Sequence, residues 1–302
     1  MKPKISIILL NWNGGEFTKP CIESLNQISY SNYDIIVVDN GSTDGSADML
    51  KKAFTNIVLL KNEKNLGFTG GNNIGIKYAL EHEADYVLIL NNDTIVDRNF
   101  LSELVKIAES DKQIGMVTCK IFSYDDPKKI LYAGGVVNKM TLKSKHIGKH
   151  EKDNGKYSVM REIDFITGCC MLVRKALIEK IGTFDEKFFA YSEDLDWSLR
   201  TLKADYKLIY APLGKLWHRE SASVRKNTLG RSKGTATPFQ HYLVNRNRIF
   251  ILKKHGNIIN YFFGGILLIF SVFYMSIGLT VLRRWIKLIA LWNGIIDGIQ
   301  IP

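Results

Sequence analysis

The first 120 residues alternate short apolar runs with amphipathic segments. The apolar runs lack a period of two, which is typical of parallel strands covered on both faces, and they occupy residues 5–10, 34–38, 57–60 and 86–90. Segments with the periodicity of an amphipathic helix lie among them, at residues 21–28, 46–54, 73–81 and 100–110. This alternation predicts an α/β fold, with a doubly wound, mainly parallel sheet flanked by helices.

Beyond residue 120 the pattern is less regular but still divides into elements. The sequence predicts hairpins or a mobile loop (120–161), a strand (162–174), helices (175–181 and 194–203), a strand stopped by Pro212 (207–211), a flexible loop (215–237) and a helix (239–254). We expect residues 1–250 to form one domain and residues 251–302 a C-terminal hydrophobic helical region.

The C-terminal region contains a long uncharged stretch. No charged side chain occurs in residues 256–282, while Lys253 and Lys254 precede the stretch and Arg283 and Arg284 follow it. Its length suits a bilayer-spanning helix, a monotopic anchor or a buried dimer helix, and residues 285–299 have the pattern of an interfacial amphipathic helix. We expect attachment to the cytoplasmic face of the cell membrane, with a homodimer as a further possibility. The first apolar run is too short for a signal peptide.

The composition adds a strong basic excess to this picture. The 302 residues carry a formal charge of +11, and 46% of them are apolar. Such an excess suits an anionic membrane surface, an anionic substrate or nucleic acid, but no zinc spacing, helix-turn-helix signature or aromatic RNA-binding strip supports a nucleic-acid partner. The four cysteines form no C-x-x-C pair, which is typical of reduced thiols in a cytosolic domain.

Polar residues end three of the predicted strands, namely Asn11, Asp39 and the run Asn91-Asn92-Asp93. Ligands of open α/β sheets bind outside the carboxyl ends of the strands. A carboxylate such as Asp93 at the mouth of a buried strand can hold a divalent cation between two phosphates, and oxygen ligands favour Mg²⁺ or Mn²⁺. The alternative for a single Asp is a turn or helix-capping role.

Two further candidate groups follow later in the chain. Glu193 and Asp194 open a predicted helix, and such a carboxylate can deprotonate an acceptor hydroxyl, although plain capping acids have the same pattern. Asp196 and Arg200 lie one turn apart and are expected to form a structural pair. His218 is a candidate metal or diphosphate ligand, with a structural role as the alternative. The basic residues after it are candidates for neutralising phosphate charge: Arg219, Arg225 and Lys226.

Taken in order, these segments resemble the family 2 glycosyltransferases with the GT-A fold, in particular the rhamnosyltransferase-like branch that builds surface polysaccharides. The matching pieces are Asn11-Trp12-Asn13, residues 39–45, 65–75 and 90–94, Gly168, residues 192–200 and His218. The resemblance implies an inverting transfer of a sugar from a dTDP- or UDP-linked donor to a glycan or lipid-linked acceptor.

The resemblance also implies roles for individual residues. Asn11 and Asp39 would line the nucleotide, with Gly71, Asn72, Asn92 and Asp93 close by. Asp93 would be the metal-binding acid of a D-x-D element, and Asp194, beside Glu193, would be the catalytic base. The chain departs from the family pattern because Asn91 replaces the first Asp, and an amide is a poorer cation ligand than a carboxylate. Metal binding is then expected to be weaker or to need His218.

Two other functions compete with this interpretation. A sugar nucleotidyltransferase needs a glycine-rich, basic phosphate loop directly after the first strand, and residues 11–15 supply none. A catalytically inactive glycan-binding or scaffold protein is favoured only by the Asn91 departure. A one-step displacement, with Asp194 taking the acceptor proton on the face opposite the leaving diphosphate, agrees with the residues present.

Overall fold

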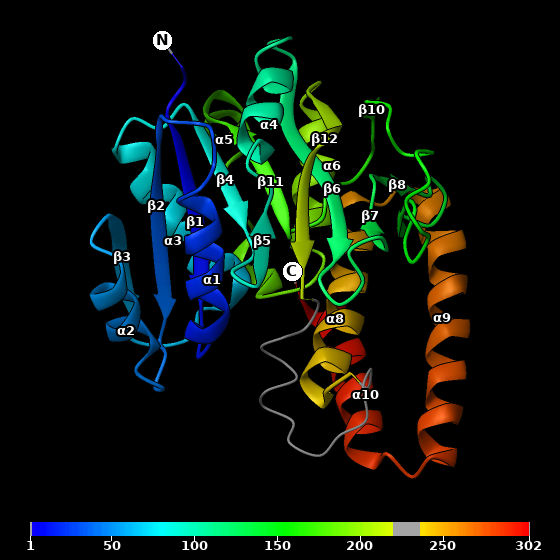
Figure 1. Cartoon of the computed structure of the whole chain (residues 1–302). Coiled ribbons are helices and arrows are strands. Elements are labelled where there is room, and N and C mark those ends of the chain that lie inside the picture. Colours follow the sequence, from blue (N-terminus) through cyan, green and yellow to red (C-terminus); the bar gives the residue numbers. More distant parts are fainter. Residues whose placement is uncertain (1, 220–235, 302) are drawn as a thin grey trace.

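The computed structural model describes residues 2–219 and 236–301. A ten-stranded mixed sheet forms its centre, with the strand order β10-β12-β6-β11-β4-β1-β2-β3 and with β5 and β7 paired to β12 and β6 (Figure 1). The strands are β1 (Ile5–Asn11), β2 (Tyr33–Asn40), β3 (Ile57–Asn62), β4 (Tyr86–Leu90), β5 (Thr94–Val96), β6 (Ile114–Ser123), β7 (Ile130–Tyr132), β10 (Arg161–Glu162), β11 (Cys170–Arg174) and β12 (Lys207–His218).

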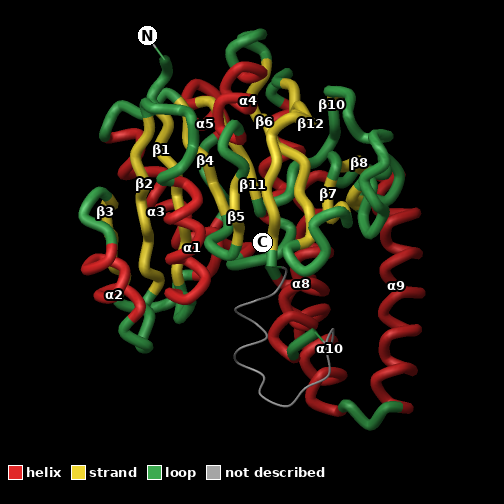
Figure 2. The backbone as a smooth tube through the Cα atoms, in the orientation of Figure 1, coloured by secondary structure: helices red, strands yellow, loops and turns green. Residues whose placement is uncertain are grey.

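Helices flank this sheet, and a small hairpin and three C-terminal helices lie beyond it (Figure 2). The helices are α1 (Gly15–Leu25), α2 (Ser46–Ala53), α3 (Gly67–Glu81), α4 (Phe100–Ala108), α5 (Lys175–Ile181), the short 3₁₀ turn η1 (Glu186–Phe188), α6 (Glu193–Lys203), α8 (Pro238–His255), α9 (Ile258–Val281) and α10 (Trp285–Gln300), and the hairpin is β8 (Gly135–Val137) with β9 (Ser144–His146). The predicted doubly wound α/β architecture is confirmed.

The sheet is buried on both faces, as the continuous apolar runs predicted. Along β1, Ile5, Ile7 and Leu9 pack with α1 and α4, whereas Ile8 packs on the opposite face with α3 and α5. The strands β4, β1, β2 and β3 run parallel to one another, and β11 runs antiparallel between β4 and β6. Because Asn11 pairs with Asp39 in register, the polar ends of β1 and β2 meet at one edge of the sheet.

Two elements extend further than the sequence predicted. The strand β12 does not stop at Pro212: a register shift between Ala211 and Lys215 absorbs the proline, and the strand continues to His218. The helix α3 begins at Gly67 rather than at residue 73. Its glycines disfavour helix intrinsically, but they allow the close packing against the sheet that is described below. The strand β6 was not predicted.

The C-terminal helices form a separate feature of the molecule. The helix α9 extends away from the sheet and α10 returns alongside α8 (Figure 1). Among the described residues, α9 is the helix long and apolar enough to cross a membrane, and 17% of its most apolar window is buried. The capacity of α9 to cross a membrane is judged from its length and composition. The helix α8 (Pro238–His255) continues across residue 250, where the domain boundary was expected.

Candidate active site

Asn11 is the centre of a buried hydrogen-bond network at the carboxyl edge of the sheet. Its side chain is fully buried, and its amide nitrogen donates to Asp39 Oδ1 at 2.8 Å and to Ser46 Oγ at 2.9 Å. Its amide oxygen accepts from Thr18 Oγ1 at 2.9 Å, and Thr18 in turn accepts from Asn92 Nδ2 at 2.7 Å. The structure therefore joins Asn11, Asp39 and Asn92, three of the predicted nucleotide-binding residues, in one chain of contacts.

The glycine-rich start of α3 is packed tightly against this edge. A Cβ added to Gly71 would lie 2.4 Å from Leu10 Cδ1 and 3.1 Å from Asn40 Nδ2, so a larger residue would have to displace these side chains. Asn72 is 1% exposed, and its amide donates to Phe68 O at 2.8 Å within the same helix. Both residues lie near the predicted nucleotide site, in positions where they shape the contact between helix and sheet.

Asp93 and His218 come together because β5 and β12 pair in antiparallel fashion, which sets His218 opposite Thr94. The distance from His218 Nε2 to Asp93 Oδ1 is 3.0 Å. Burial alone would lower the pKa of His218, but its neighbours Cys169 and Asp93 outweigh burial and raise this pKa well above its ordinary value. Because burial keeps the Cys169 thiol neutral by raising its pKa, the carboxylate of Asp93 is the charge that favours a protonated imidazole.

The Asp93–His218 pair is chemically suited to a divalent cation. A carboxylate oxygen and an imidazole nitrogen 3.0 Å apart can hold Mg²⁺ or Mn²⁺ when substrate phosphates and water supply the remaining ligands. In residues 2–219 and 236–301 no group of three or more His, Cys, Asp or Glu side chains gathers as a metal site. The donor set thus fits a cation shared with a diphosphate, and the amide of Asn91, 3.4 Å from His218 Nε2, flanks it.

Asp194 lies in the first turn of α6, and backbone donors orient its carboxylate. Gly168 N donates to Oδ2 at 3.0 Å and Leu195 N donates to Oδ1 at 2.8 Å. Burial raises the pKa of Asp194 to about 6, although these hydrogen bonds act in the opposite direction. Asp194 is therefore ionised at neutral pH and still basic enough to accept a proton.

Glu193 differs from Asp194 although the two are neighbours in sequence. Its side chain is 6% exposed, and Oε2 has no hydrogen-bond partner within the described residues. Burial and the charge of Asp194 raise the pKa of Glu193 well above its ordinary value. Burial and the neighbouring charge thus both favour the neutral form of the Glu193 carboxyl group.

A single short loop connects the two carboxylate groups of interest. Gly168 donates its N–H to Asp194, while the adjacent Cys169 accepts from Asn91 N at 3.0 Å and lies within hydrogen-bonding reach of His218. The Asp93–His218 pair and Asp194 therefore both contact this loop, at the adjacent residues Cys169 and Gly168.

The turn that leads into α6, residues 188–192, has an unusual backbone. Phe189, Tyr191 and Ser192 have φ values of 62°, 70° and 69°, and Ala190 N donates to Phe188 O at 2.7 Å. Positive φ in bulky side chains is rare, and each such residue costs on the order of 1–3 kcal/mol. Strain of this kind persists only where surrounding contacts impose it, and it is typical of functional sites.

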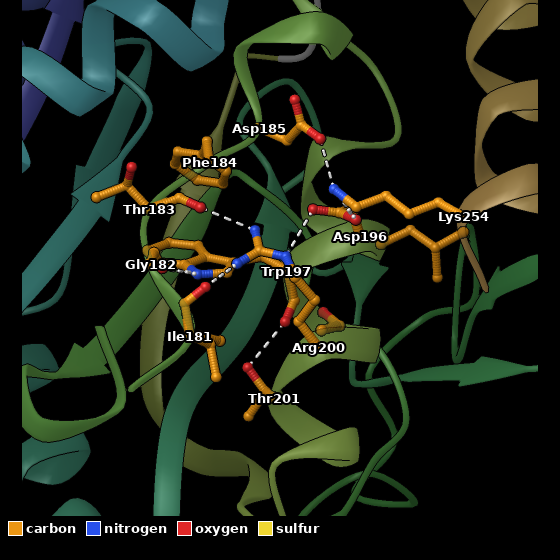
Figure 3. A network of polar contacts seen from close by, with 12 residues as sticks. Ile181, Gly182, Thr183, Phe184, Asp185, Asp196, Trp197, Arg200, Thr201 and Lys254 are labelled. Atoms are coloured by element: carbon orange, nitrogen blue, oxygen red, sulfur yellow. Dashed lines mark hydrogen bonds and ion pairs between the residues drawn. The ribbon is translucent and has the colours of Figure 1, made fainter. Parts of the chain in front are cut away.

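A buried ionic network holds the opposite side of α6. The carboxylate of Asp196 is fully buried and accepts from Arg200 Nε at 2.9 Å, Lys254 Nζ at 3.0 Å and His255 Nε2 at 2.7 Å. Figure 3 shows Arg200 and Lys254 converging on Asp196, with Lys254 also reaching Asp185. The predicted Asp196–Arg200 pair is confirmed, and the network attaches the C-terminal end of α8 to α6.

The remaining basic candidates are only partly described. The guanidinium of Arg219 lies over the ring of Tyr124, 4.0 Å from its centroid, while Arg225 and Lys226 lie outside the described residues. Sequence reasoning missed Thr18, the entry turn of α6 and the α8 side chains that contact it. The position of Thr18, one turn after the glycines that begin α1, could have indicated its role. No local sequence pattern could have indicated the contacts of the α8 side chains.

Residues 6–182, more than half of the chain, match glycosyl transferase family 2. The protein belongs to this family. Asn11, Asp39, Gly71, Asn72, Asn92 and Asp93 all lie within the matched residues, and Glu193, Asp194 and His218 follow them.

Individual relatives of the chain are named as enzymes of glycan synthesis. The low-salt glycan biosynthesis hexosyltransferase Agl10 of Haloferax volcanii is 25% identical over 213 residues, which cover 69% of this chain and 64% of Agl10. An N-acetylglucosaminyl-diphospho-decaprenol L-rhamnosyltransferase of Mycobacterium tuberculosis is 23% identical over 245 residues, which cover 75% of this chain and 80% of the relative. The chain thus spans slightly less than two thirds of Agl10.

The fold is also found in solved structures. The crystal structure of GalNAc-T7 with UDP, GalNAc and Mn²⁺ matches with a TM-score of 0.67 at 14% identity, over 86% of this chain and 50% of that chain. This likeness confirms a GT-A-type fold.

Proposed function

We propose that this protein is an inverting glycosyltransferase that moves a sugar from a dTDP- or UDP-linked donor to a glycan or lipid-linked acceptor in cell-surface polysaccharide synthesis. One observation carries the proposal: the Asp93–His218 pair and Asp194 flank the loop at Gly168 and Cys169. A diphosphate site and a base that contact adjacent residues of one loop suit direct displacement at the anomeric carbon.

On this proposal the nucleotide binds at the ends of β1 and β2. Asp39 accepts hydrogen bonds from the base or ribose, and Asn11 fixes the Asp39 carboxylate from behind at 2.8 Å. Asn92 flanks the diphosphate and is oriented through Thr18. Gly71 and Asn72 keep α3 close enough to the sheet to form the wall of the site.

Asp93 and His218 are the residues that would hold Mg²⁺ or Mn²⁺. When bound there, the cation neutralises charge on the departing diphosphate. Within the protein itself, Asp93 places a carboxylate at this point and His218 supplies a nitrogen once its proton is displaced.

Asp194 performs the proton transfer. It takes the proton of the acceptor hydroxyl as that oxygen bonds to the anomeric carbon, and the bond between this carbon and the diphosphate oxygen breaks on the opposite face. The single displacement inverts the anomeric configuration and needs no covalent enzyme intermediate. Because burial and the charge of Asp194 favour the neutral form of Glu193, Asp194 is the base of the pair.

The C-terminal region, residues 251–302, places the enzyme at the cytoplasmic face of the membrane on this proposal. The helix α9 is apolar and largely exposed, and one side of α10 carries Trp285, Ile289 and Trp292, which are about half exposed. Such surfaces suit the acyl and headgroup layers of a bilayer, where a lipid-linked acceptor lies. A second copy of the chain is the alternative cover for the same surface.

The proposal is tested first with donors. A panel of nucleotide sugars is screened for thermal stabilisation with Mn²⁺ and with a chelator. We expect one nucleotide series to raise the melting temperature with the metal only, and Asp93→Asn to abolish the rise. An Asp111→Asn control, at the opposite edge of the sheet before β6, should leave the rise unchanged.

Turnover then tests the roles of the residues. With the donor selected by the screen, Asp194→Asn is expected to reduce transfer by about 10²–10⁴-fold, as for loss of a general base, while Asp111→Asn has little effect. Product analysis by NMR should show inversion. Full activity in Asp194→Asn, or a product with retained configuration, would refute the proposed mechanism, and no turnover with any donor would favour the inactive glycan-binding alternative.

A further inference from the structure

The turn before α6, residues 188–192, is held from outside through its backbone carbonyls. Every carbonyl oxygen from Lys187 to Tyr191 accepts a hydrogen bond from another element. Phe189 O accepts from Thr69 N of α3 at 3.1 Å, and the other four accept from two neighbouring side chains of α8, Arg246 and Asn247. The strained turn thus rests on α8 along most of its length.

Asn247 makes the larger share of these contacts. Its side chain is fully buried, and Nδ2 lies 3.0 Å from Phe188 O, 2.8 Å from Ala190 O and 2.6 Å from Tyr191 O. Because an amide nitrogen has two hydrogens for these three acceptors, at least one hydrogen is shared. Arg246 Nε donates to Asn247 Oδ1 at 2.9 Å, which fixes the amide with its nitrogen towards the turn.

These contacts explain how residues 188–192 keep a backbone conformation that is unfavourable on its own. Residues in sparsely populated φ/ψ regions relax unless their surroundings over-determine them, and three of the five residues in this turn have positive φ. The turn ends at Ser192, directly before Glu193 and Asp194. A change in its backbone therefore moves the first turn of α6 and the carboxylate of Asp194.

We propose that Asn247 is a positioning residue for sugar transfer, which holds residues 188–192 in the conformation that aims Asp194 at the acceptor. This inference rests on the proposed role of Asp194 as the base. Asn247 itself touches neither donor nor acceptor, and the nucleotide site at Asn11 and Asp39 lies on other elements. Its loss should therefore reduce the rate of transfer and spare nucleotide binding.

The chain supplies a matched control in the same helix. Asn245 is also buried, at 2% exposure, but its amide donates to His241 O at 2.7 Å within α8 and leaves the turn untouched. Asn247→Ala and Asn245→Ala are compared in the full chain for kcat, for the KM of the selected donor, and for affinity for UDP and dTDP with Mn²⁺. A displacement of about 1 Å can cost about 100-fold in rate, so kcat of Asn247→Ala should fall by about that factor while nucleotide affinity changes less than about threefold.

Amide hydrogen exchange supplies a readout that does not depend on turnover. In Asn247→Ala the amides of residues 187–195 should exchange faster than in the wild type and in Asn245→Ala, while those of β1 and β2 should not change. If Asn247→Ala does not fold, Asn247→Ser, which keeps one hydroxyl donor, replaces it under the same criteria.

The outcomes separate the two proposals. Equal losses of kcat in both alanine variants, a parallel loss of nucleotide affinity, or unchanged exchange at 187–195 would each overturn the role of Asn247. If the wild type transfers no sugar from any donor, the proposed function fails, and the exchange comparison alone then decides whether Asn247 holds the turn.

Discussion

With Asp194 as the proposed base, its raised pKa predicts that activity and stability respond to pH in opposite directions. This pKa rises from an ordinary 3.8 to about 6 in the folded protein, and each pH unit of such a difference corresponds to about 1.4 kcal/mol. The folded state therefore binds this proton more tightly than the unfolded chain by about 3 kcal/mol. Protonation stabilises the fold, and the stabilisation is complete below pH 3.8 and is lost as pH rises towards 6.

The perturbation is a pH series on the wild type and on Asp194→Asn, which cannot titrate at this position. Between about pH 4.5 and about pH 7.5, the free energy of unfolding of the wild type should fall relative to the variant by about 2 kcal/mol. Over the same range kcat/KM of the wild type should rise, with an apparent pKa near 6 and about a tenfold loss at pH 5. Urea unfolding at each pH measures the first quantity, and initial rates with the selected donor measure the second.

The comparison has a clear refuting result. If the difference in unfolding free energy between wild type and Asp194→Asn is independent of pH, the carboxylate does not have the raised pKa that its burial requires. If that difference follows pH but kcat/KM stays flat down to about pH 5, Asp194 titrates as described and another group is the base.

Three further predictions concern packing, the ionic network and the neighbouring acid. Gly71→Ala should destabilise the protein by about 1–3 kcal/mol in urea unfolding, because the new Cβ would contact Leu10 at 2.4 Å, whereas Gly278→Ala, which meets open space, should not; equal effects would contradict the packing argument. Asp196→Ala should cost about 2–3 kcal/mol by the same measurement, since the partly exposed Arg200 and Lys254 lose their hydrogen bonds to a fully buried carboxylate, and a cost below about 1 kcal/mol would contradict it. Glu193→Gln should keep kcat/KM within about tenfold of the wild type. Glu193→Asp, which moves the carboxyl group, should reduce kcat/KM further. The reverse order in a rate assay would show that Glu193 acts in its ionised form.

Much of the sheet was predictable because burial on both faces leaves a simple signature. The strands β1 to β4 appear as continuous apolar runs, and each run ends in polar residues. Since parallel strands place their carboxyl ends at one edge, the proximity of Asn11 and Asp39 followed from the sequence. The structure adds the contact itself, at 2.8 Å, and the threonine that extends it to Asn92.

Other elements were not predictable because tertiary contacts override their local patterns. The strand β6 contains Lys120, which is buried only because Asp153 pairs with it at 2.8 Å. The strand β12 continues through Pro212 by means of a bulge, and His218 reaches Asp93 only as a result. Asn247 contacts carbonyls 56 to 59 residues away in the chain, and no local pattern reports such a partner.

The packing of α10 against α8 bears on how a water-soluble form of the enzyme should be made. Gly294 and Gly298 of α10 lie directly against the backbone of Tyr242 and Arg246, and Lys253 Nζ donates to Ile299 O at 3.0 Å. Truncation after α8 would strip this cover from the helix that carries Asn247 and leave apolar surface in its place. Replacing outward side chains of α9 with polar ones, while retaining α10, would increase solubility and leave the contacts of α8 with residues 188–192 intact.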